Sequence, residues 1–580
     1  MTQTALTGRT GLAEYPGIPE EFAAKYRAAG YWIDETFQDF VLDRCDRFAD
    51  RTAFVACSSR DPETGSLATQ TWTYADLEDE ARRSARTLLD VGVAPGDRVI
   101  PQLPNTAEYM AYLCGAFLVG ALPVFALPKH RASELGHFAR KADAAAHIVC
   151  QGAEGFDYLG LYREYADGMR AEGLQPPVLI EASGQVTESE DGVVAILDRP
   201  EPLLDLPRPV RNRGAERLSE NVAFLQLSGG TTGMSKLIPR THADYLYSVR
   251  ASDPICGVDR ETRMLVVLPA AHNFTMSSPG ILGVLHEGGS LVFAADPSPQ
   301  TAFSLIEQER VTMASLVPPL LQAWILSAQR RSPDLSSLRT VQVGGAKLAP
   351  SVAEKVGPVL GARLQQVFGM AEGLVNYTRD TDPEELVVRT QGVPISPDDE
   401  LLVVDDDDRP VAEGETGHLL TRGPYTIRGY YLEDKANRFG FTEDGYYRTG
   451  DIVRLHPTGH VEVTGRSKDQ INRAGEKIAV DEIEDVALSA DGVADAVVVG
   501  IPDDDLGERV GLVVLPRDDA DFGADPRTWF REWFRERGIA EFKIPERVEI
   551  RRDLPLTNVG KISRRHLRTA LAEDLAASRP

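Results

Sequence analysis

The sequence predicts an α/β protein: a large N-terminal domain of mostly parallel sheets covered by helices, followed by a small, mobile α+β domain. Three observations support this. Helix-like and strand-like segments alternate along most of the chain, the pattern changes after about residue 465, and a polar, glycine-bearing stretch joins the two parts. With 580 residues, 42% of them hydrophobic, the chain is long enough for several domains and a large core.

The alternation is clearest near the start of the chain. Segments with helical spacing and segments typical of buried strands follow one another at 73–92, 97–103, 105–120 and 122–127. The second helix begins with Asn105 and Glu108, which predicts a capping arrangement. Similar alternation returns at 263–269, 280–294 and 338–345. The pattern indicates parallel strands connected by helices.

The C-terminal part has a different order of elements. The sequence predicts a helix, two strands, an amphipathic helix, a strand and a final helix, at 481–492, 493–503, 507–517, 525–538, 546–555 and 563–576. We therefore place an N-terminal core at 1–465 and a C-terminal domain at 466–580. A plain surface loop is the alternative for the junction at 464–477, but its position between the two parts favours a hinge.

Composition excludes several classes of partner. The net charge of −26 argues against nucleic acid or an anionic membrane, although local lysines and backbone amides can still bind a small anion. The five cysteines form no C-x-x-C pair, which favours a reducing cytoplasm over a disulfide or zinc framework. The N-terminus has no apolar signal core, and the most apolar stretch, 113–127, is too short to span a membrane. We expect a cytoplasmic protein.

The stretch LSGGTTGMSK, residues 227–236, has the composition of a phosphate-binding loop. Its glycines let backbone N–H groups approach an anion closely, and its hydroxyls and lysine add donors. It is not the P-loop of ATPases, because Met234 stands where that motif has its second glycine. A flexible linker is the alternative, but the stretch lies between two apolar runs. The predicted phosphate-binding residues are Ser228, Gly229, Gly230, Thr231, Thr232, Gly233 and Lys236.

Further stretches carry residues suited to catalysis or ligand binding. Taken singly, a histidine, glutamate or lysine is more often structural or solvated, so the order of the stretches along the chain is the stronger signal. In that order they contain His272, Asn273 and Ser278 (AAHNFTMSSPG), Gly344 and Gly345 (VGGAKL), Glu372 (VFGMAEG), Asp451 (YYRTGD) and Lys561 (PLTNVGKISR).

Together these motifs resemble the adenylate-forming superfamily of acyl-CoA synthetases, luciferases and peptide-synthetase adenylation domains. The resemblance runs from about residue 50 to 575 and also includes GRSKDQINRAGEKI. It implies an enzyme that uses ATP and Mg²⁺ to join a carboxylic acid to AMP, releases pyrophosphate and then passes the acyl group to a thiol.

The resemblance also assigns roles to positions of this chain. Glu372 matches the Mg²⁺ ligand, and the catalytic positions are matched by His272, Glu372 and Lys561. Besides the loop residues, the ATP-binding positions are matched by Gly344, Gly345, Ala346, Asp451, Arg466 and Lys561. Lys468 matches the hinge about which the small domain rotates between the two half-reactions, and Gly475 the lining of the thiol tunnel.

The HNF triplet at 272–274 resembles the stand-alone aryl-acid ligases of siderophore pathways, in which the asparagine hydrogen-bonds an ortho hydroxyl. A neutral residue at Asn273 also argues against a substrate with a charged amine, which would lack a partner. Ser278 stands where salicylate activators often have cysteine and favours 2,3-dihydroxybenzoate over salicylate; 3-hydroxyanthranilate is a further alternative. The aryl-acid positions are matched by Asn273, Phe274, Ser278, Gly345, Val367 and Val375.

The expected partners are an aromatic acid and the phosphopantetheine arm of an aryl or acyl carrier protein, in siderophore or related secondary-metabolite biosynthesis. Two alternatives stay open. One is a benzoate-type acyl-CoA ligase with coenzyme A as the acceptor. The other is a non-catalytic relative that only binds a nucleotide or a carrier protein, against which the presence of Lys561, Glu372 and Asp451 argues.

Overall fold

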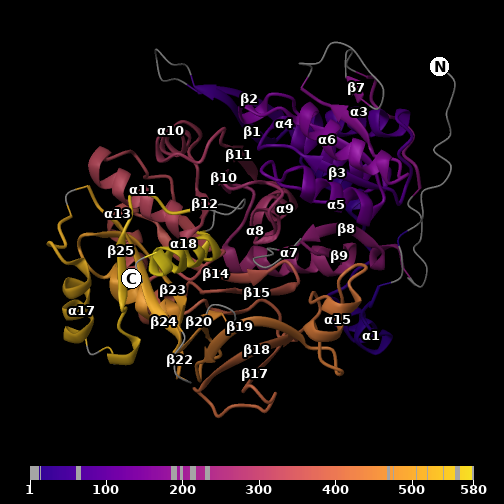
Figure 1. The fold of residues 1–580 in the computed structure, drawn as a ribbon. Helices are drawn as coiled ribbons and strands as arrows, with labels where there is room; N and C mark the ends of the chain where they lie inside the picture. Colours follow the sequence, from indigo (N-terminus) through magenta and orange to yellow (C-terminus); the bar gives the residue numbers. More distant parts are fainter. Residues whose placement is uncertain are drawn as a thin grey trace.

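The structure is a computed structural model, and it describes most of the chain. The described residues are 12, 15–60, 67–183, 193–195, 200–208, 217–228, 235–466, 470–473, 476–503, 506–518, 520–537, 539, 541–555 and 562–577. Their strands form five sheets with helices packed around them (Figure 1). The predicted class, a large α/β part with mostly parallel sheets and a smaller α+β part, is confirmed.

The largest sheet has nine strands, in the order β16-β15-β14-β13-β12-β10-β11-β1-β2. The strands from β14 to β1 are parallel, and antiparallel strands close both edges. Their bounds are β1 Thr52–Arg60, β2 Leu67–Thr73, β10 Arg263–Val266, β11 Ser290–Phe293, β12 Met313–Leu316, β13 Thr340–Gly344, β14 Arg363–Met370, β15 Gly373–Tyr377 and β16 Val393–Pro394.

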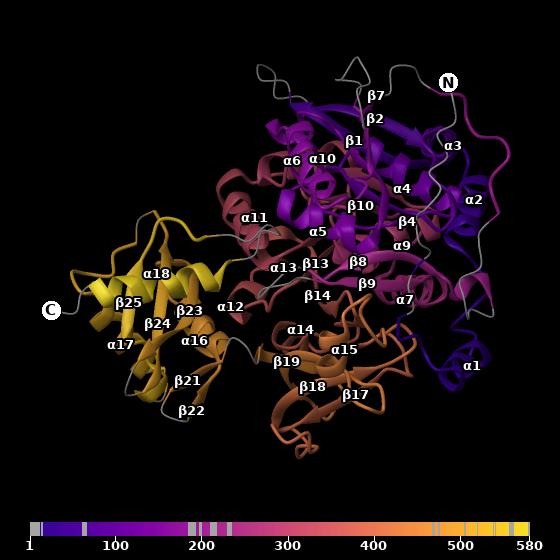
Figure 2. The same cartoon turned by 45° about the vertical axis from the view of Figure 1, so that its right-hand side comes forward.

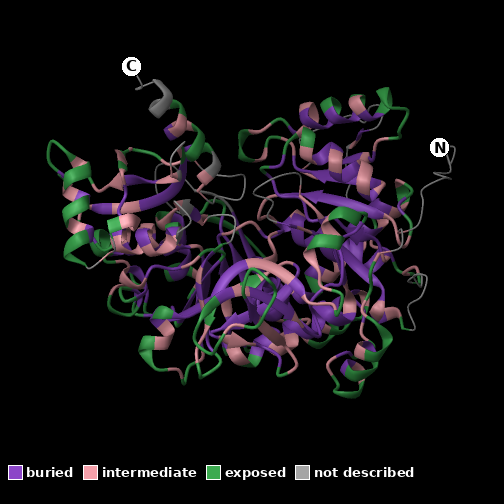
Figure 3. Ribbon diagram, turned by 60° about the horizontal axis from the view of Figure 1, so that its bottom comes forward, coloured by how far each residue is buried: buried purple, intermediate pink, exposed green. Residues whose placement is uncertain are grey.

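Helices cover both faces of this sheet. In β10, Met264 and Val266 belong to one apolar core and Leu265 to another, as the alternation of side chains along a strand requires. Figure 3 shows the strands as buried and the outer helices as partly exposed. The helices on the first face are α7 His242–Cys256, α8 Asn273–Ser277 and α9 Gly280–Glu287, and those on the second are α10 Pro299–Glu309, α11 Pro318–Arg331, α12 Pro350–Ala353 and α13 Val356–Leu360.

A second sheet of five parallel strands contains the region of clearest predicted alternation. The strand order is β4-β3-β5-β6-β7. Its strands are β3 Arg98–Gln102, β4 Leu122–Pro123, β5 Ala144–Val149, β6 Val178–Glu181 and β7 Val193–Ala195. The helices nearby are α2 Phe37–Arg47, α3 Tyr74–Asp90, α4 Ala107–Val119, α5 Ala132–Ala142 and α6 Tyr158–Ala171. Helix α1 Glu20–Ala28 lies apart from this sheet, where its Lys25 Nζ is 2.7 Å from Asp398 Oδ1.

Two details of this region differ from the sequence-based prediction. The strand predicted at 122–127 ends at Pro123, and the chain beyond it pairs with the hairpin strand β8, where Phe125 N donates to Leu225 O at 3.2 Å. The predicted cap at Asn105 is wrong: Thr106 is the N-cap of α4. The Asn105 side chain instead donates to Leu268 O at 2.9 Å and accepts from Ala270 N at 2.8 Å. A long-range contact thus replaces the local one.

The remaining elements of the large part are a hairpin and an antiparallel sheet. The hairpin joins β8 Val222–Leu227 to β9 Leu237–Thr241. The four-stranded sheet has β17 Glu400–Val404, β18 Thr416–Arg422, β19 Tyr447–Leu455 and β20 Val461–Arg466 in sequential order. Helices α14 Glu384–Arg389 and α15 Asp434–Gly440 lie in the neighbouring connections.

The C-terminal elements have a sheet and an apolar core of their own. They are β21 Ile471–Arg473, β22 Glu476–Ile478, α16 Val480–Leu488, β23 Val493–Asp503, β24 Gly507–Pro516, α17 Pro526–Glu536, β25 Arg547–Ile550 and α18 Arg564–Ala577. Figure 2 shows them grouped beside the large part. One polar contact between the two parts is an ion pair in which Lys347 Nζ lies 2.9 Å from Asp485 Oδ2 of α16.

All five cysteines are buried and free. Among the described residues, no helix has the length and apolarity needed to cross a membrane.

Candidate active site

Most of the predicted site residues that the structure describes lie near the carboxyl ends of parallel strands, where open α/β sheets bind ligands. The chain leaves β10 toward His272, β13 ends at Gly344, and β14 leads into the turn that holds Glu372. Asp451 lies on β19 of the adjacent sheet.

The base of the predicted phosphate loop is a closed hairpin end. Ser228 N donates to Lys236 O at 3.0 Å, and Lys236 N donates to Ser228 Oγ at 2.9 Å. The Lys236 ammonium lies 4.7 Å from the ring centroid of Tyr430. The loop residues themselves lie outside the described residues, namely Gly229, Gly230, Thr231, Thr232 and Gly233.

Two tyrosines hold the predicted metal ligand Glu372. The Tyr430 hydroxyl donates to Glu372 Oε1 at 2.9 Å and lies 3.0 Å from the Tyr447 hydroxyl. Burial, and then the Glu372 charge, raise the pKa of both tyrosines well above their usual range, so both remain donors. Neither tyrosine was predicted as a site residue, although Tyr447 stands in the YYRTGD motif.

Glu372 has the properties of a cation ligand. Its side chain is buried, and its partner within the described part of the chain is the Tyr430 hydroxyl rather than a cationic side chain. A buried carboxylate with only hydroxyl donors is costly unless a positive charge compensates it. Carboxylate oxygen is also the ligand that Mg²⁺ prefers, so the residues present fit such an ion.

Asp451 and Arg466 face each other across the β19–β20 pair. Arg466 Nε lies 2.9 Å from Asp451 Oδ1. The Asp451 side chain is 5% exposed, whereas that of Arg466 is 52% exposed. One carboxylate oxygen is thus held by the arginine, on the same strand as Tyr447.

Three predicted ring-binding residues, Phe274, Val367 and Val375, come together in an apolar region with Gly344, which was predicted to bind ATP. Gly344 pairs with Val367 in the sheet, and a Cβ on Gly344 would lie 3.1 Å from Phe274 Cζ and 2.8 Å from the Val367 carbonyl oxygen. Phe274, Val367 and Val375 belong to the same apolar cluster. Gly344 therefore has no room for a side chain, and its backbone lies directly against Phe274 and Val367. The predicted Gly345 and Ala346 follow it and are exposed.

The segment around α8 brings the predicted polar residues to this region. His272 is the N-cap of α8, and its Nδ1 accepts from Phe274 N at 3.3 Å. Asn273 Oδ1 accepts from the Tyr245 hydroxyl at 2.8 Å. Ser278 is buried, and its side chain hydrogen-bonds Tyr377, whose hydroxyl donates to Ser252 Oγ at 3.1 Å.

Three of the predicted residues in the C-terminal part lie outside the described residues, so their positions stay predictions. They are Lys468, Gly475 and Lys561.

A buried arginine connects the hairpin to the Glu372 turn. Arg240 donates to Ala371 O at 2.8 Å and to Tyr425 O at 3.1 Å, and its Nε lies 3.0 Å from Asp244 Oδ1. Its guanidinium also lies 4.7 Å from the ring centroid of Tyr245. Arg240 was not predicted from the sequence. The feature that could have indicated it is a single charged residue in an otherwise apolar strand.

Arg240→Met is expected to lower the free energy of unfolding by about 3–5 kcal/mol, because it leaves Asp244 buried without its cation. Burial already raises the pKa of Asp244, and the Arg240 charge offsets part of that rise. The measurement is urea denaturation followed by fluorescence. The Arg240→Met/Asp244→Asn double variant has no unpaired buried charge at this position, so its free energy of unfolding should be higher than that of Arg240→Met. Equal losses in the two variants would contradict this account.

Comparison with known proteins now adds to the geometry. The AMP-binding enzyme family matches residues 41–431, and the AMP-binding enzyme C-terminal domain matches 482–561. The chain therefore belongs to the AMP-binding enzyme family, which confirms the resemblance to adenylate-forming enzymes and the use of ATP.

Two relatives and one solved structure show which members of the family the chain is similar to. The chain is 48% identical over 562 residues to the 2,3-dihydroxybenzoate-AMP ligase of Bacillus subtilis, covering 96% of this chain and 98% of that protein. It is 41% identical to the salicyl-AMP ligase / salicyl-S-ArCP synthetase of Mycobacterium tuberculosis, covering 96% and 94%. The apo structure of Mycobacterium smegmatis MbtA matches with a TM-score of 0.67 and 37% identity, covering 96% and 98%. The non-catalytic alternative has no support among these relatives.

Proposed function

We propose that this enzyme activates an ortho-hydroxylated aromatic acid with ATP. The acid carboxylate attacks the α-phosphorus, which forms the aryl-adenylate and releases pyrophosphate. The aryl group then passes to the phosphopantetheine thiol of a carrier protein. 2,3-Dihydroxybenzoate is the favoured acid, and siderophore or related secondary-metabolite biosynthesis is the setting. Similarity to a 2,3-dihydroxybenzoate-AMP ligase and to a salicyl-S-ArCP synthetase supports both steps.

The observation that supports the proposal is that one apolar region and one charged region are both built from the predicted site residues. A narrow apolar region at Phe274, Gly344 and Val367 has Asn273 beside it, which suits a flat ring with an ortho hydroxyl. The adjoining region holds Glu372 and Lys236 around Tyr430, which suits a nucleotide. The proposal places the ring of the acid in the first region and the nucleotide in the second.

Charge neutralisation and positioning supply most of such a reaction. Lys236, at the hairpin base, is assigned to the leaving pyrophosphate together with the loop that follows Ser228. Asp451 can accept hydrogen bonds from both ribose hydroxyls, and Arg466 fixes one of its oxygens. Mg²⁺ held by Glu372 would offset the phosphate charge. We assign Lys561 to the contact with the carboxylate and the α-phosphate.

The division into two domains, 1–465 and 466–580, is part of the proposal. Arg466 ends β20, the last strand of the antiparallel sheet, and Ile471 begins a strand of a different sheet. The intervening residues include Lys468, which we assign as the hinge. A cytoplasmic location likewise stays a prediction.

Substrate preference tests this proposal. We expect kcat/KM for adenylation to be highest with 2,3-dihydroxybenzoate, lower with salicylate and lowest with benzoate. Without the ortho oxygen, the NH₂ group of Asn273 is left unpaired at a cost of about 1–3 kcal/mol, or about ten- to a hundredfold. Ser278→Cys should narrow the gap between the first two acids, since a thiol is a weaker hydrogen-bond partner.

The measurement is pyrophosphate release at saturating ATP, followed by transfer to a holo carrier protein or to coenzyme A. Equal kcat/KM values for benzoate and the ortho-hydroxy acids would remove the hydrogen-bonding account. If the aryl group is transferred faster to coenzyme A than to the carrier protein, then coenzyme A is the acceptor and the enzyme is an acyl-CoA ligase.

A further inference from the structure

A buried tyrosine fixes the orientation of the Asn273 amide. Tyr245 of α7 is fully buried, and its hydroxyl donates to Asn273 Oδ1 at 2.8 Å. Burial raises the pKa of Tyr245 to about 12, so the phenol keeps its proton. That single proton is the one donated to Asn273 Oδ1.

This pairing determines which end of the amide is available to a ligand. The carbonyl oxygen of Asn273 accepts from Tyr245, whereas no residue in the described part of the chain forms a hydrogen bond with its NH₂ group. Asn273 is only partly buried, so the NH₂ group is not sealed inside the core. An amide in this orientation presents a donor, and the matching ligand group is an acceptor.

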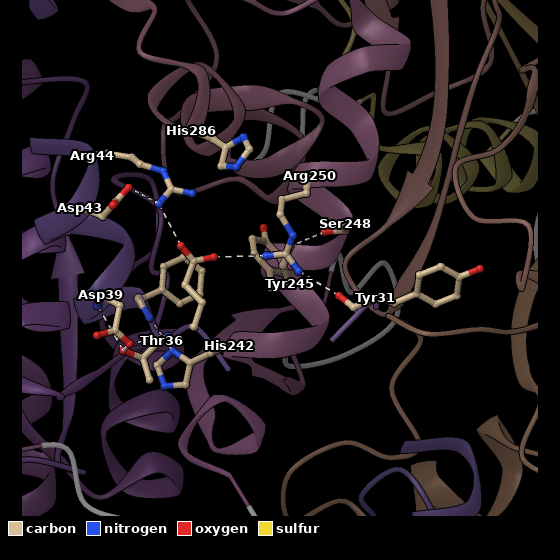
Figure 4. A network of polar contacts seen from close by, with 12 residues as sticks. Tyr31, Thr36, Asp39, Asp43, Arg44, His242, Tyr245, Ser248, Arg250 and His286 are labelled. Atoms are coloured by element: carbon tan, nitrogen blue, oxygen red, sulfur yellow. Dashed lines mark hydrogen bonds and ion pairs between the residues drawn. The ribbon is translucent and has the colours of Figure 1, made fainter. Parts of the chain in front are cut away.

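The tyrosine has little freedom to change this orientation. Its ring packs edge-on against Phe224, with centroids 4.6 Å apart. Helix α7 is anchored to the segment before α2: Arg250 lies 3.3 Å from Glu35 and donates to Tyr31 O at 2.9 Å, and His242 accepts from Phe37 N at 3.0 Å. Figure 4 shows this network around Tyr245, with Arg44 bound to the same glutamate.

We propose that Tyr245 is a positioning residue that makes the enzyme selective for 2-hydroxy over 2-amino aromatic acids. A phenol or phenolate oxygen accepts readily from the Asn273 NH₂ group. An aromatic amine is a donor whose lone pair is delocalised into the ring, so it meets the NH₂ group donor to donor. The assignment rests on the proposed function, and it argues against 3-hydroxyanthranilate as the substrate.

The test compares salicylate with 2-aminobenzoate, which differ only in the ortho group. Wild-type enzyme should prefer salicylate by at least about tenfold in kcat/KM for pyrophosphate release. In Tyr245→Phe the amide is free to turn, and the preference should fall by about tenfold, mainly through KM. The same ratio is measured as Kd by calorimetry, which does not depend on turnover.

Two controls separate positioning from general damage. Tyr247→Phe removes another hydroxyl of α7, which donates to Ser396 Oγ at 2.7 Å, and should leave the ratio unchanged. In an Asn273→Ala background the Tyr245→Phe change should have no further effect on the ratio. If the ratio of the kcat/KM values for the two acids is unchanged in Tyr245→Phe, or if the wild type uses both acids equally, the role of Tyr245 is overturned but the proposed function is not. If neither acid binds, the proposed function is overturned with it.

Discussion

Lys561→Ala is expected to lower adenylate formation by several orders of magnitude while leaving transfer from pre-made aryl-adenylate largely intact. The lysine is assigned to the first half-reaction, where its ammonium offsets charge on both the carboxylate and the α-phosphate. Lys236, Glu372 and Asp451 all belong to the large part, whereas Lys561 precedes in the sequence Ile562, which packs against an apolar cluster of the small part.

The two half-reactions are measured separately, by pyrophosphate exchange and by loading of the carrier protein from synthetic aryl-adenylate. Lys543→Ala is the matched control, because Lys543 is in the same part but pairs with Glu482, at 2.7 Å. That variant should retain both activities. Equal losses in both half-reactions of Lys561→Ala would mean that the lysine does not act in the first step alone.

Lys468→Pro is expected to have the opposite effect: adenylation persists and thioester formation falls by orders of magnitude. The chain passes from one sheet to another between Arg466 and Ile471, so the torsion angles of these few residues set the orientation of the small part. Proline fixes its own φ and restricts the residue before it, here Ser467. A rotation that needs these angles to change is then blocked.

Single-turnover assays follow adenylate formation and carrier loading in this variant. Lys468→Ala removes the same charge but keeps the backbone freedom, so it should load the carrier at a rate much closer to that of the wild type. Normal carrier loading by Lys468→Pro would show that the pivot lies elsewhere.

The fold could be predicted because its elements repeat a local pattern. Parallel strands buried on both faces give apolar runs between amphipathic helices, and this signal survives without knowledge of the partners. The prediction failed where a distant partner decided the outcome. Asn105 follows the capping pattern, but its side chain binds the backbone of Leu268 and Ala270 instead.

The same limit explains which site residues were found. Glu372 and Asp451 stand in motifs that resemble a family, whereas Tyr430 acts by contact with a residue far away in the sequence. Tyr245 and Arg240 have no distinguishing neighbours in the sequence, because their roles come from side chains that only the folded chain brings to them. Supporting residues of this kind are visible only once the tertiary contacts are known.

The ion pair between Lys347 and Asp485 bears on the speed of the whole cycle. It holds the small part against the large one in the orientation seen here, at an N–O distance of 2.9 Å. If each product requires two orientations, this bond breaks and re-forms once per turnover, although neither residue belongs to the chemistry. A much stronger contact would delay departure from this orientation, and a much weaker one would delay return to it. In that cycle the strength of this one contact would influence the rate of turnover as well as the stability of the orientation seen here.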